Sequence, residues 1–357
     1  MKGRENNNQT ANGIIDAIIP RKGDSIPTVA RKCVLPAAAV LLIVSGCMLI
    51  GKLGEQPPEP IILQYMCEVG QIDIPEVQIT EEEKKPAEIL PEYRELYEQN
   101  NDLVGWIRID GTMIDDPVMQ ISGFKGTEDN AYIYEKNMYY LTRDFYKEDY
   151  REGCIVADYR APITADGRAA NTLLYGHNMS SGRRFHDIAY YDPYFYGEYG
   201  IQFYKDHPVI EFDTIYEKGK YKVFAAMQTN IYEADGSPVF YYALTYTFKN
   251  KSDFYDYYGK VLDRSMFYNS DVDLQYGDEV IVLSTCDFTT FAHVKDIRFV
   301  VFARRVREGE SEEVDTSKYY VNPDPLYYDY YYSVCGGAWG GRNWDPALLK
   351  GYEPKNS

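Results

Sequence analysis

Short apolar runs separated by turn residues dominate the chain from Leu103 to Val306. Within these runs, apolar residues either alternate with polar ones or fill several consecutive positions, and both patterns are typical of β-strands. The runs expected to form strands are Val104–Ile109, Met113–Gln120, Cys154–Ala157, Asn171–Tyr175, Val209–Phe212, Lys220–Ala226, Glu279–Thr285 and Ile297–Arg305. About eight short strands with turns between them predict a closed barrel or a sandwich, and hence a mainly β protein.

Two further segments have helical spacing. Between Glu81 and Asp102, apolar residues recur every three or four positions on a charged background that Pro91 interrupts. This predicts an amphipathic helix, or a helix pair broken at Pro91, that packs on the strands. A second helix is expected at Ser252–Ser265, which has one apolar face. That face consists of Phe254, Tyr257, Tyr258, Val261 and Leu262.

The N-terminal region has the features of a membrane anchor. No charged residue occurs from Cys33 to Gly51, and a helix of about 19 residues spans roughly the hydrocarbon core of a bilayer. The excess of basic residues before it favours a cytoplasmic N-terminus, with everything after Lys52 outside the cell. A cleavable signal peptide and a lipoprotein site at Cys47 are the alternatives. The long charged leader argues against the first, and the apolar residues after Cys47 argue against the second.

These patterns divide the chain into five parts. They are a cytoplasmic segment (1–32), a transmembrane anchor (33–53), a proline-containing extracellular stalk (54–80), a β-rich domain (81–306) and an acidic, tyrosine-rich extension (307–357). The extension lacks a periodic apolar pattern, so we expect it to be flexible or draped over the domain. A tail this aromatic is a candidate lid for a functional site.

Composition excludes several classes of function. The net charge is −18 at pH 7, and because the leader is basic, the part after Lys52 is more acidic still. Binding to nucleic acid is therefore not expected. The six cysteines form no Cys-x-x-Cys pair, and no His-Glu-x-x-His motif occurs. Neither a disulfide scaffold nor a metal site is predicted, and a single reactive thiol becomes the feature to look for.

Cys286 is the best candidate for that thiol. It ends an apolar run in which alternation places Val282, Ser284 and Cys286 on one face, and Asp287 follows directly. A cysteine at the end of a strand lies where barrels carry functional groups. The competing interpretation is that Cys286 is a small buried hydrophobic residue, which is the commoner fate of a free cysteine.

His177 is the candidate acid or base. It follows Gly176 at the end of an apolar strand, and its charge changes near neutral pH. A surface histidine in a turn is the alternative. His186 and His207 lie in less informative surroundings, and His293 competes with His177 because it is only seven residues from Cys286.

Arg298 opens the apolar strand expected to pair with the cysteine strand. Its guanidinium could donate hydrogen bonds to an oxyanion beside the thiol. Alternatively, Arg298 could snorkel to water from an edge strand, as we expect of Arg304 and Arg305. A thiol, a base and an oxyanion donor at strand ends together form a set of groups suited to acyl transfer.

The sequence resembles a class B sortase across roughly residues 90–306, through five motifs in the family's order. They are Asn101 to Ile107, Asp115 to Gln120, Asn171 to Met179 with Tyr175-Gly176-His177-Asn178-Met179, Leu283 to Cys286, and Arg298 to Val301. The helix expected before the cysteine strand also matches this class. The resemblance implies a closed eight-stranded barrel with N-terminal helices, which makes 81–306 the catalytic domain, and an enzyme held in the cell membrane by one N-terminal span.

The resemblance also implies roles for individual residues. Cys286, His177 and Arg298 correspond to the family's nucleophile, histidine and arginine, whereas His293 has no counterpart. Ser284 matches a serine that helps to hold substrate, and we expect Thr285, Asp287 and Asn178 to contact substrate beside it.

The implied reaction is cleavage of an Asn-Pro-x-Thr-x sorting signal after threonine, through a thioester, without metal or cofactor. The implied partners are surface proteins or pilins that carry the signal, and an amine acceptor such as a peptidoglycan precursor or a pilin lysine. Two other functions remain open at this point: a cysteine protease that hydrolyses the same thioester, and a non-catalytic adhesin on a β-barrel. Asn322-Pro323-Asp324-Pro325 in the tail lacks the threonine of a sorting signal.

Overall fold

The computed structural model describes residues 87–231, 240–291 and 297–353. The chain divides into two units, Met1–Pro60 and Ile61–Ser357, and all the described residues belong to the second. The expected cytoplasmic segment, anchor and stalk lie outside the described residues. None of the helices described here is both long and apolar enough to cross a bilayer.

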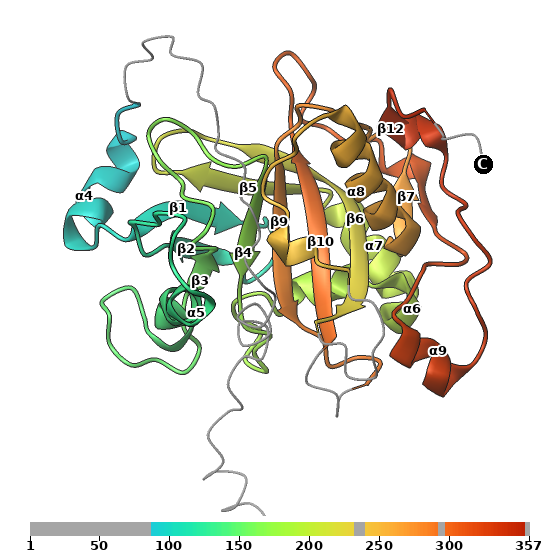
Figure 1. Ribbon diagram of the computed structural model, residues 1–357, viewed down its shortest axis with the longest axis horizontal. Coiled ribbons are helices and arrows are strands. Elements are labelled where there is room, and N and C mark those ends of the chain that lie inside the picture. The colour runs from blue at the N-terminus through green and yellow to red at the C-terminus, as the bar shows by residue number, and fades with distance from the viewer. Residues whose placement is uncertain (1–86, 232–239, 292–296, 354–357) are drawn as a thin grey trace, which may run out of the picture. The chain divides into compact units, whose positions relative to one another are not determined.

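Within the described residues, eight strands close into a barrel in the order β1-β2-β3-β4-β9-β10-β6-β5 (Figure 1). The strands are β1 (Leu103–Arg108), β2 (Asp115–Met119), β3 (Ile155–Ala157), β4 (Asn171–Tyr175), β5 (Val209–Thr214), β6 (Lys220–Asn230), β9 (Val280–Cys286) and β10 (Ile297–Arg305). The predicted closed barrel is confirmed. β10 lies between β9 and β6 and is therefore an interior strand of the barrel.

Both faces of the wall formed by β4, β9 and β10 are buried, which explains their nearly continuous apolar sequences. Val280 and Val282 belong to one hydrophobic cluster, and Ile281 and Leu283 belong to a second cluster on the opposite face. This alternation confirms that Val282 shares a face of β9 with Ser284 and Cys286.

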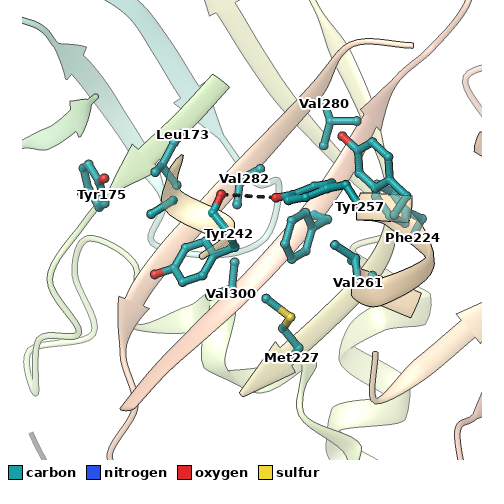
Figure 2. Packing of buried hydrophobic residues seen from close by; sticks show 14 of the residues in the cluster. Leu173, Tyr175, Phe224, Met227, Tyr242, Tyr257, Val261, Val280, Val282 and Val300 are labelled. Atoms are coloured by element: carbon teal, nitrogen blue, oxygen red, sulfur yellow. Dashed lines mark hydrogen bonds between the residues drawn. The ribbon is translucent and has the colours of Figure 1, made fainter. Parts of the chain in front are cut away.

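The helix α8 (Lys251–Arg264) covers the first of these faces. It confirms the helix expected at Ser252–Ser265 and buries the predicted apolar face. Figure 2 shows Tyr257 and Val261 of α8 in the same hydrophobic cluster as Val282 of β9 and Val300 of β10. Tyr257 also donates a hydrogen bond of 3.2 Å to the backbone carbonyl of Tyr242, which is part of the short helix η3 (Tyr242–Leu244).

The other helices lie outside the barrel wall. α4 (Pro91–Gln99) begins at Pro91, because proline is tolerated in the first turn of a helix, where its missing N–H has no intrahelical partner. The remaining helical elements are α5 (Asn130–Tyr139), η1 (Tyr140–Thr142), η2 (Asp187–Tyr191), α6 (Pro193–Tyr196), α7 (Glu198–Asp206), η4 (Thr316–Lys318), α9 (Asp329–Cys335) and η5 (Pro346–Leu348).

Residues 307–353 pack on the barrel domain at several points. The strand β11 (Tyr319–Val321) pairs with β7 (Phe267–Asn269), and β12 (Leu349–Lys350) pairs with β8 (Leu274–Gln275). Trp344, Leu348 and Leu349 join the hydrophobic cluster beneath α8. In Figure 1 this segment, coloured red, runs beside α8 and β7.

Candidate active site

Cys286 and Arg298 are register partners on the antiparallel strands β9 and β10. Residues directly opposite each other in such a pair carry their side chains on the same face, with their Cβ atoms about 5 Å apart. Cys286 is the last residue of β9 and is partly exposed, whereas the Arg298 side chain is almost fully buried, at 1% exposure. The pairing therefore places a guanidinium next to an accessible thiol.

The backbone at this strand end holds both residues. The carbonyl oxygen of Ile297 accepts a hydrogen bond of 3.0 Å from the Asp287 N–H and another of 2.9 Å from Nη1 of Arg298. One peptide group thus closes the strand pair and orients the guanidinium.

His177 reaches the same place by following β9. β4 and β9 are parallel and in register up to Tyr175 and Ser284. Beyond β4, the Gly176 N–H donates to the Ser284 carbonyl at 3.2 Å, and Nδ2 of Asn178 donates to the Cys286 carbonyl at 3.0 Å. Since His177 lies between these two contacts, its backbone runs alongside Cys286.

The tautomer of His177 follows from its hydrogen bond. Nε2 lies 2.8 Å from the backbone carbonyl oxygen of Leu141, and because a carbonyl can only accept, Nε2 must carry a proton. Burial lowers the pKa of His177, and the positive charges of Arg184 and Arg298 lower it further. The imidazole is therefore neutral at pH 7, with Nδ1 as the atom that can accept a proton.

The three residues share one electrostatic environment. Arg298 lowers the pKa of His177, and the charges of both Arg298 and Cys286 act on the buried phenol of Tyr242. The pKa of Tyr242 is raised to about 12, chiefly by burial. The structure thus brings together the three residues that the sequence singled out, and their catalytic roles remain a prediction.

The other cysteines of the described segments differ from Cys286. Cys154 is buried, and burial raises the pKa of its thiol to about 12, so it stays protonated at neutral pH. Cys335 is exposed on α9. His293, the competing histidine, lies outside the described residues.

The four residues expected to contact substrate are engaged in internal hydrogen bonds. The Ser284 hydroxyl pairs with the Tyr242 hydroxyl at 2.8 Å, and Oγ1 of Thr285 donates to the Gly176 carbonyl at 2.8 Å. Asn178 binds the Cys286 carbonyl, as described above. Of the four, Ser284 alone shares the face of Cys286, and its contact with substrate remains a prediction like that of the others.

Asp287 directly follows Cys286 at the end of β9 and is buried. Its Oδ1 accepts hydrogen bonds of 2.7 Å from both the N–H and the hydroxyl of Thr289. Burial raises the pKa of Asp287 and raises that of the neighbouring Asp192 to about 6. Asp192 caps α6 by accepting from the backbone N–H groups of Tyr194 and Phe195, and the negative charge of Asp287 adds to its raised pKa.

His186 supports the candidate active site through Asn178, a role that the sequence did not reveal. Nδ2 of Asn178 donates to the backbone carbonyl of Cys286, and Oδ1 of Asn178 lies 2.7 Å from Nδ1 of His186. Because an amide oxygen can only accept, Nδ1 of His186 must carry a proton. Nε2 of His186 lies 3.2 Å from the Tyr190 hydroxyl. This chain of hydrogen bonds fixes the backbone carbonyl of Cys286, the candidate nucleophile. It depends on the hairpin in which Asn178 pairs with Arg184, and no sequence pattern predicts that hairpin.

The expectation that Arg304 snorkels to water is wrong. Its side chain is fully buried and forms two hydrogen bonds of 2.7 Å with Glu310. β10 is an interior strand, so Arg304 cannot reach solvent, and Glu310 turns back to neutralise it. Arg305 is partly exposed and pairs with Glu217 and Glu279.

A cavity of about 1230 Å³ lies at the other end of the β9–β10 pair, where Glu279 and Arg305 line it. Cys286 does not border this cavity. Within the described residues, no three His, Cys, Asp or Glu side chains are grouped so that they could hold a metal ion.

Two known proteins with sequences similar to this chain are sortases. No family model matches it. Sortase B of Listeria monocytogenes is 34% identical over 201 residues, which cover 56% of this chain and 69% of that protein. Sortase B of Staphylococcus aureus is 30% identical over 224 residues, which cover 63% of this chain and 78% of the relative.

Solved structures of the same kind are also similar. A Staphylococcus aureus sortase B–substrate complex has a TM-score of 0.48 and 28% identity, covering 61% of this chain and 86% of that one. A Bacillus anthracis sortase B complex with the compound AAEK1 has a TM-score of 0.48 and 24% identity, covering 69% and 93%. On the strength of the two sequence relatives, the chain belongs to the class B sortases and is a cysteine transpeptidase.

Proposed function

We propose that Cys286 is the nucleophile of this sortase, His177 its acid and base, and Arg298 its oxyanion donor. The observation that supports this assignment is the register pairing of Cys286 with Arg298, with His177 on the neighbouring strand end. The proposed substrate is a protein with a sorting signal of the type Asn-Pro-x-Thr-x, cleaved after threonine. Ser284 is the proposed substrate contact on the same face.

Acylation begins with the transfer of the Cys286 proton to Nδ1 of His177. The thiolate attacks the threonine carbonyl carbon, and the developing oxyanion accepts hydrogen bonds from the Arg298 guanidinium. When the scissile C–N bond breaks, the imidazolium returns its proton to the leaving amine. The products are a thioester on Cys286 and a neutral His177.

Transfer reverses these roles. The nitrogen of an incoming amine attacks the thioester carbonyl, and His177 takes a proton from that amine. The C–S bond then breaks, the imidazolium reprotonates the sulfur, and a new amide is released. Because His177 is neutral at rest, it can serve as the base in both half-reactions.

The proposed setting is the outer face of a cell membrane. The uncharged segment from Cys33 to Gly51 would span the membrane once, with the basic leader in the cytoplasm. The proposed acceptors are a peptidoglycan precursor, which gives wall anchoring, or a pilin lysine, which gives pilus assembly.

The test uses the full-length protein and fluorogenic peptides of the pattern Asn-Pro-x-Thr-x, with x varied. We expect turnover by the wild type and a mass increase of Cys286 by one acyl group. Cys286→Ala should abolish both, whereas Cys335→Ala, which removes an exposed free thiol, should change neither.

Adding a peptide amine separates transfer from hydrolysis. We expect the amide product to form at the expense of free acid. Free acid alone at every amine concentration would instead identify a cysteine protease. Turnover by Cys286→Ala would refute the assignment of the nucleophile.

A further inference from the structure

The C-terminal extension packs a cluster of tyrosines against Phe291, which follows β9, and against Ile297, the first residue of β10. Tyr328, Tyr330 and Tyr331, in and beside α9, surround Phe291, and their ring centroids lie 6.5, 5.4 and 6.2 Å from that of Phe291. Tyr328 is buried with Phe291 and Ile297 in a small hydrophobic cluster of its own. This cluster lies next to the candidate nucleophile and arginine, because Ile297 directly precedes Arg298.

The tail is fixed on the barrel domain before and after this cluster. On one side, Asn322 is fully buried; its Nδ2 donates to the Ser265 carbonyl at 2.6 Å, and its N–H donates to the Met266 carbonyl at 2.9 Å. On the other side, Asp263 of α8 accepts hydrogen bonds from Arg342 at 2.8 and 2.9 Å and from Trp344 at 2.7 Å. These contacts fix the extension on both sides of Tyr328, so Tyr328 is held in place in its cluster with Phe291 and Ile297.

Ile297 connects this hydrophobic cluster to the proposed catalytic arginine, Arg298. Its side chain is 2% exposed and packs in the cluster with Tyr328, whereas its carbonyl oxygen accepts from both the Asp287 N–H and Nη1 of Arg298. If the Ile297 peptide shifts, the guanidinium shifts with it. A displacement of about 1 Å at a catalytic group can cost on the order of a hundredfold in rate.

We propose that Tyr328 is a positioning residue for acyl transfer, which holds the Ile297 peptide where it aims Arg298 at the oxyanion. The inference rests on the proposed role of Arg298. It assigns the C-terminal extension a supporting function. A lid would slow the enzyme when closed, whereas here loosening the extension should slow the enzyme.

The ring of Tyr328 carries this role, and its hydroxyl does not. The hydroxyl is buried and has no hydrogen-bond partner among the described residues. Tyr328→Phe keeps the ring and removes only that unpaired hydroxyl, so it should preserve the packing against Phe291 and Ile297. Tyr328→Ala removes the packing against Phe291 and Ile297.

The experiment compares full-length wild type, Tyr328→Ala, Tyr328→Phe and a control, Val334→Ala, on the exposed surface of α9. kcat and KM are measured with an Asn-Pro-x-Thr-x peptide that the wild type cleaves. The rate of alkylation of Cys286 by iodoacetamide is followed on the Cys286 peptide by mass spectrometry, since Cys335 is also exposed. Alkylation needs an accessible thiolate but no oxyanion donor.

We expect Tyr328→Ala to lower kcat about tenfold or more, with KM and the alkylation rate within about twofold of wild type. Tyr328→Phe and Val334→Ala should match the wild type. An unchanged or raised kcat in Tyr328→Ala overturns the inference, and so does a parallel loss of alkylation, which indicates general disruption.

Combining Tyr328→Ala with Arg298→Lys tests the route of action. If Tyr328 acts through Arg298, the second substitution adds little to the first. Additive losses overturn the inference. An Arg298→Lys enzyme as fast as wild type overturns the proposed function and the inference with it, whereas a slow Arg298→Lys beside a normal Tyr328→Ala overturns the inference alone.

Discussion

Arg298 faces Cys286 across a single strand pair, and its guanidinium bonds the carbonyl of Ile297, its own neighbour. Two residues twelve positions apart thus meet because one strand ends and the next begins beside it. This pairing supplies the sortase with a fixed positive charge at the accessible thiol.

Arg298→Lys should lower kcat/KM by about 10² to 10³, because lysine cannot present the guanidinium's planar set of donors to an oxyanion. Arg304→Lys is the matched control on the same strand and face, where the guanidinium pairs with Glu310. It should cost about 1 to 3 kcal/mol of unfolding free energy, with kcat/KM nearly unchanged. Peptide turnover and urea unfolding measure the two effects, and equal activity losses in both variants contradict the assignment.

The acid limb of the pH profile of kcat/KM should lie below about 6.5, the ordinary pKa of histidine. Burial and the charges of Arg184 and Arg298 depress the pKa of His177, so the imidazole stays neutral, and able to accept a proton, to lower pH. Initial rates from pH 5 to 8 provide the measurement. A limb centred above pH 7 contradicts the prediction.

Asn178→Asp should slow turnover, because a carboxylate cannot donate to the Cys286 carbonyl and would repel it. We expect a loss of about tenfold in kcat and about 1 to 3 kcal/mol in stability, the usual cost of an unpaired buried acceptor. Asn101→Asp, at an exposed position, is the control. Wild-type kinetics in Asn178→Asp would show that the brace is dispensable.

Asp192→Asn should stabilise the protein at pH 7.5 and have little effect at pH 4.5. The pKa of Asp192 is raised from 3.8 to about 6, so the native state binds its proton more tightly than the unfolded chain does. The contribution of Asp192 to the free energy of unfolding is therefore fully present below pH 4 and is lost as pH rises through 6. The gain at pH 7.5 should be on the order of 2 kcal/mol, because asparagine also caps helices. Thermal unfolding at both pH values measures it, and a stabilisation that grows toward acid pH would refute the prediction.

The barrel strands could be predicted because their burial follows their apolar patterns. β10 has the expected bounds, Ile297–Arg305, since its sequence is apolar almost throughout. β6 was expected to end at Ala226 but continues to Asn230, because Gln228 and Thr229 are polar and yet buried. Polar residues that find partners inside the protein carry no sequence signal of burial.

The tail and the supports of the site could not be predicted in this way. β7, β8, β11 and β12 have only two or three residues each, too few for a period to be visible. The partner of His177 is the backbone carbonyl of Leu141, and any residue type offers a carbonyl. Cys286, His177 and Arg298 were recognisable because each has a side chain with distinctive chemistry at a strand end.

The pairing of β12 with β8, and the burial of Trp344 beside α8, have a consequence for biosynthesis. Trp344 and β12 follow all eight barrel strands in the sequence, so a nascent chain has its barrel strands well before it has the full complement of apolar groups under α8. Contacts between segments so distant in sequence also form slowly. Maturation of this sortase should therefore be complete only after translation has passed Leu349.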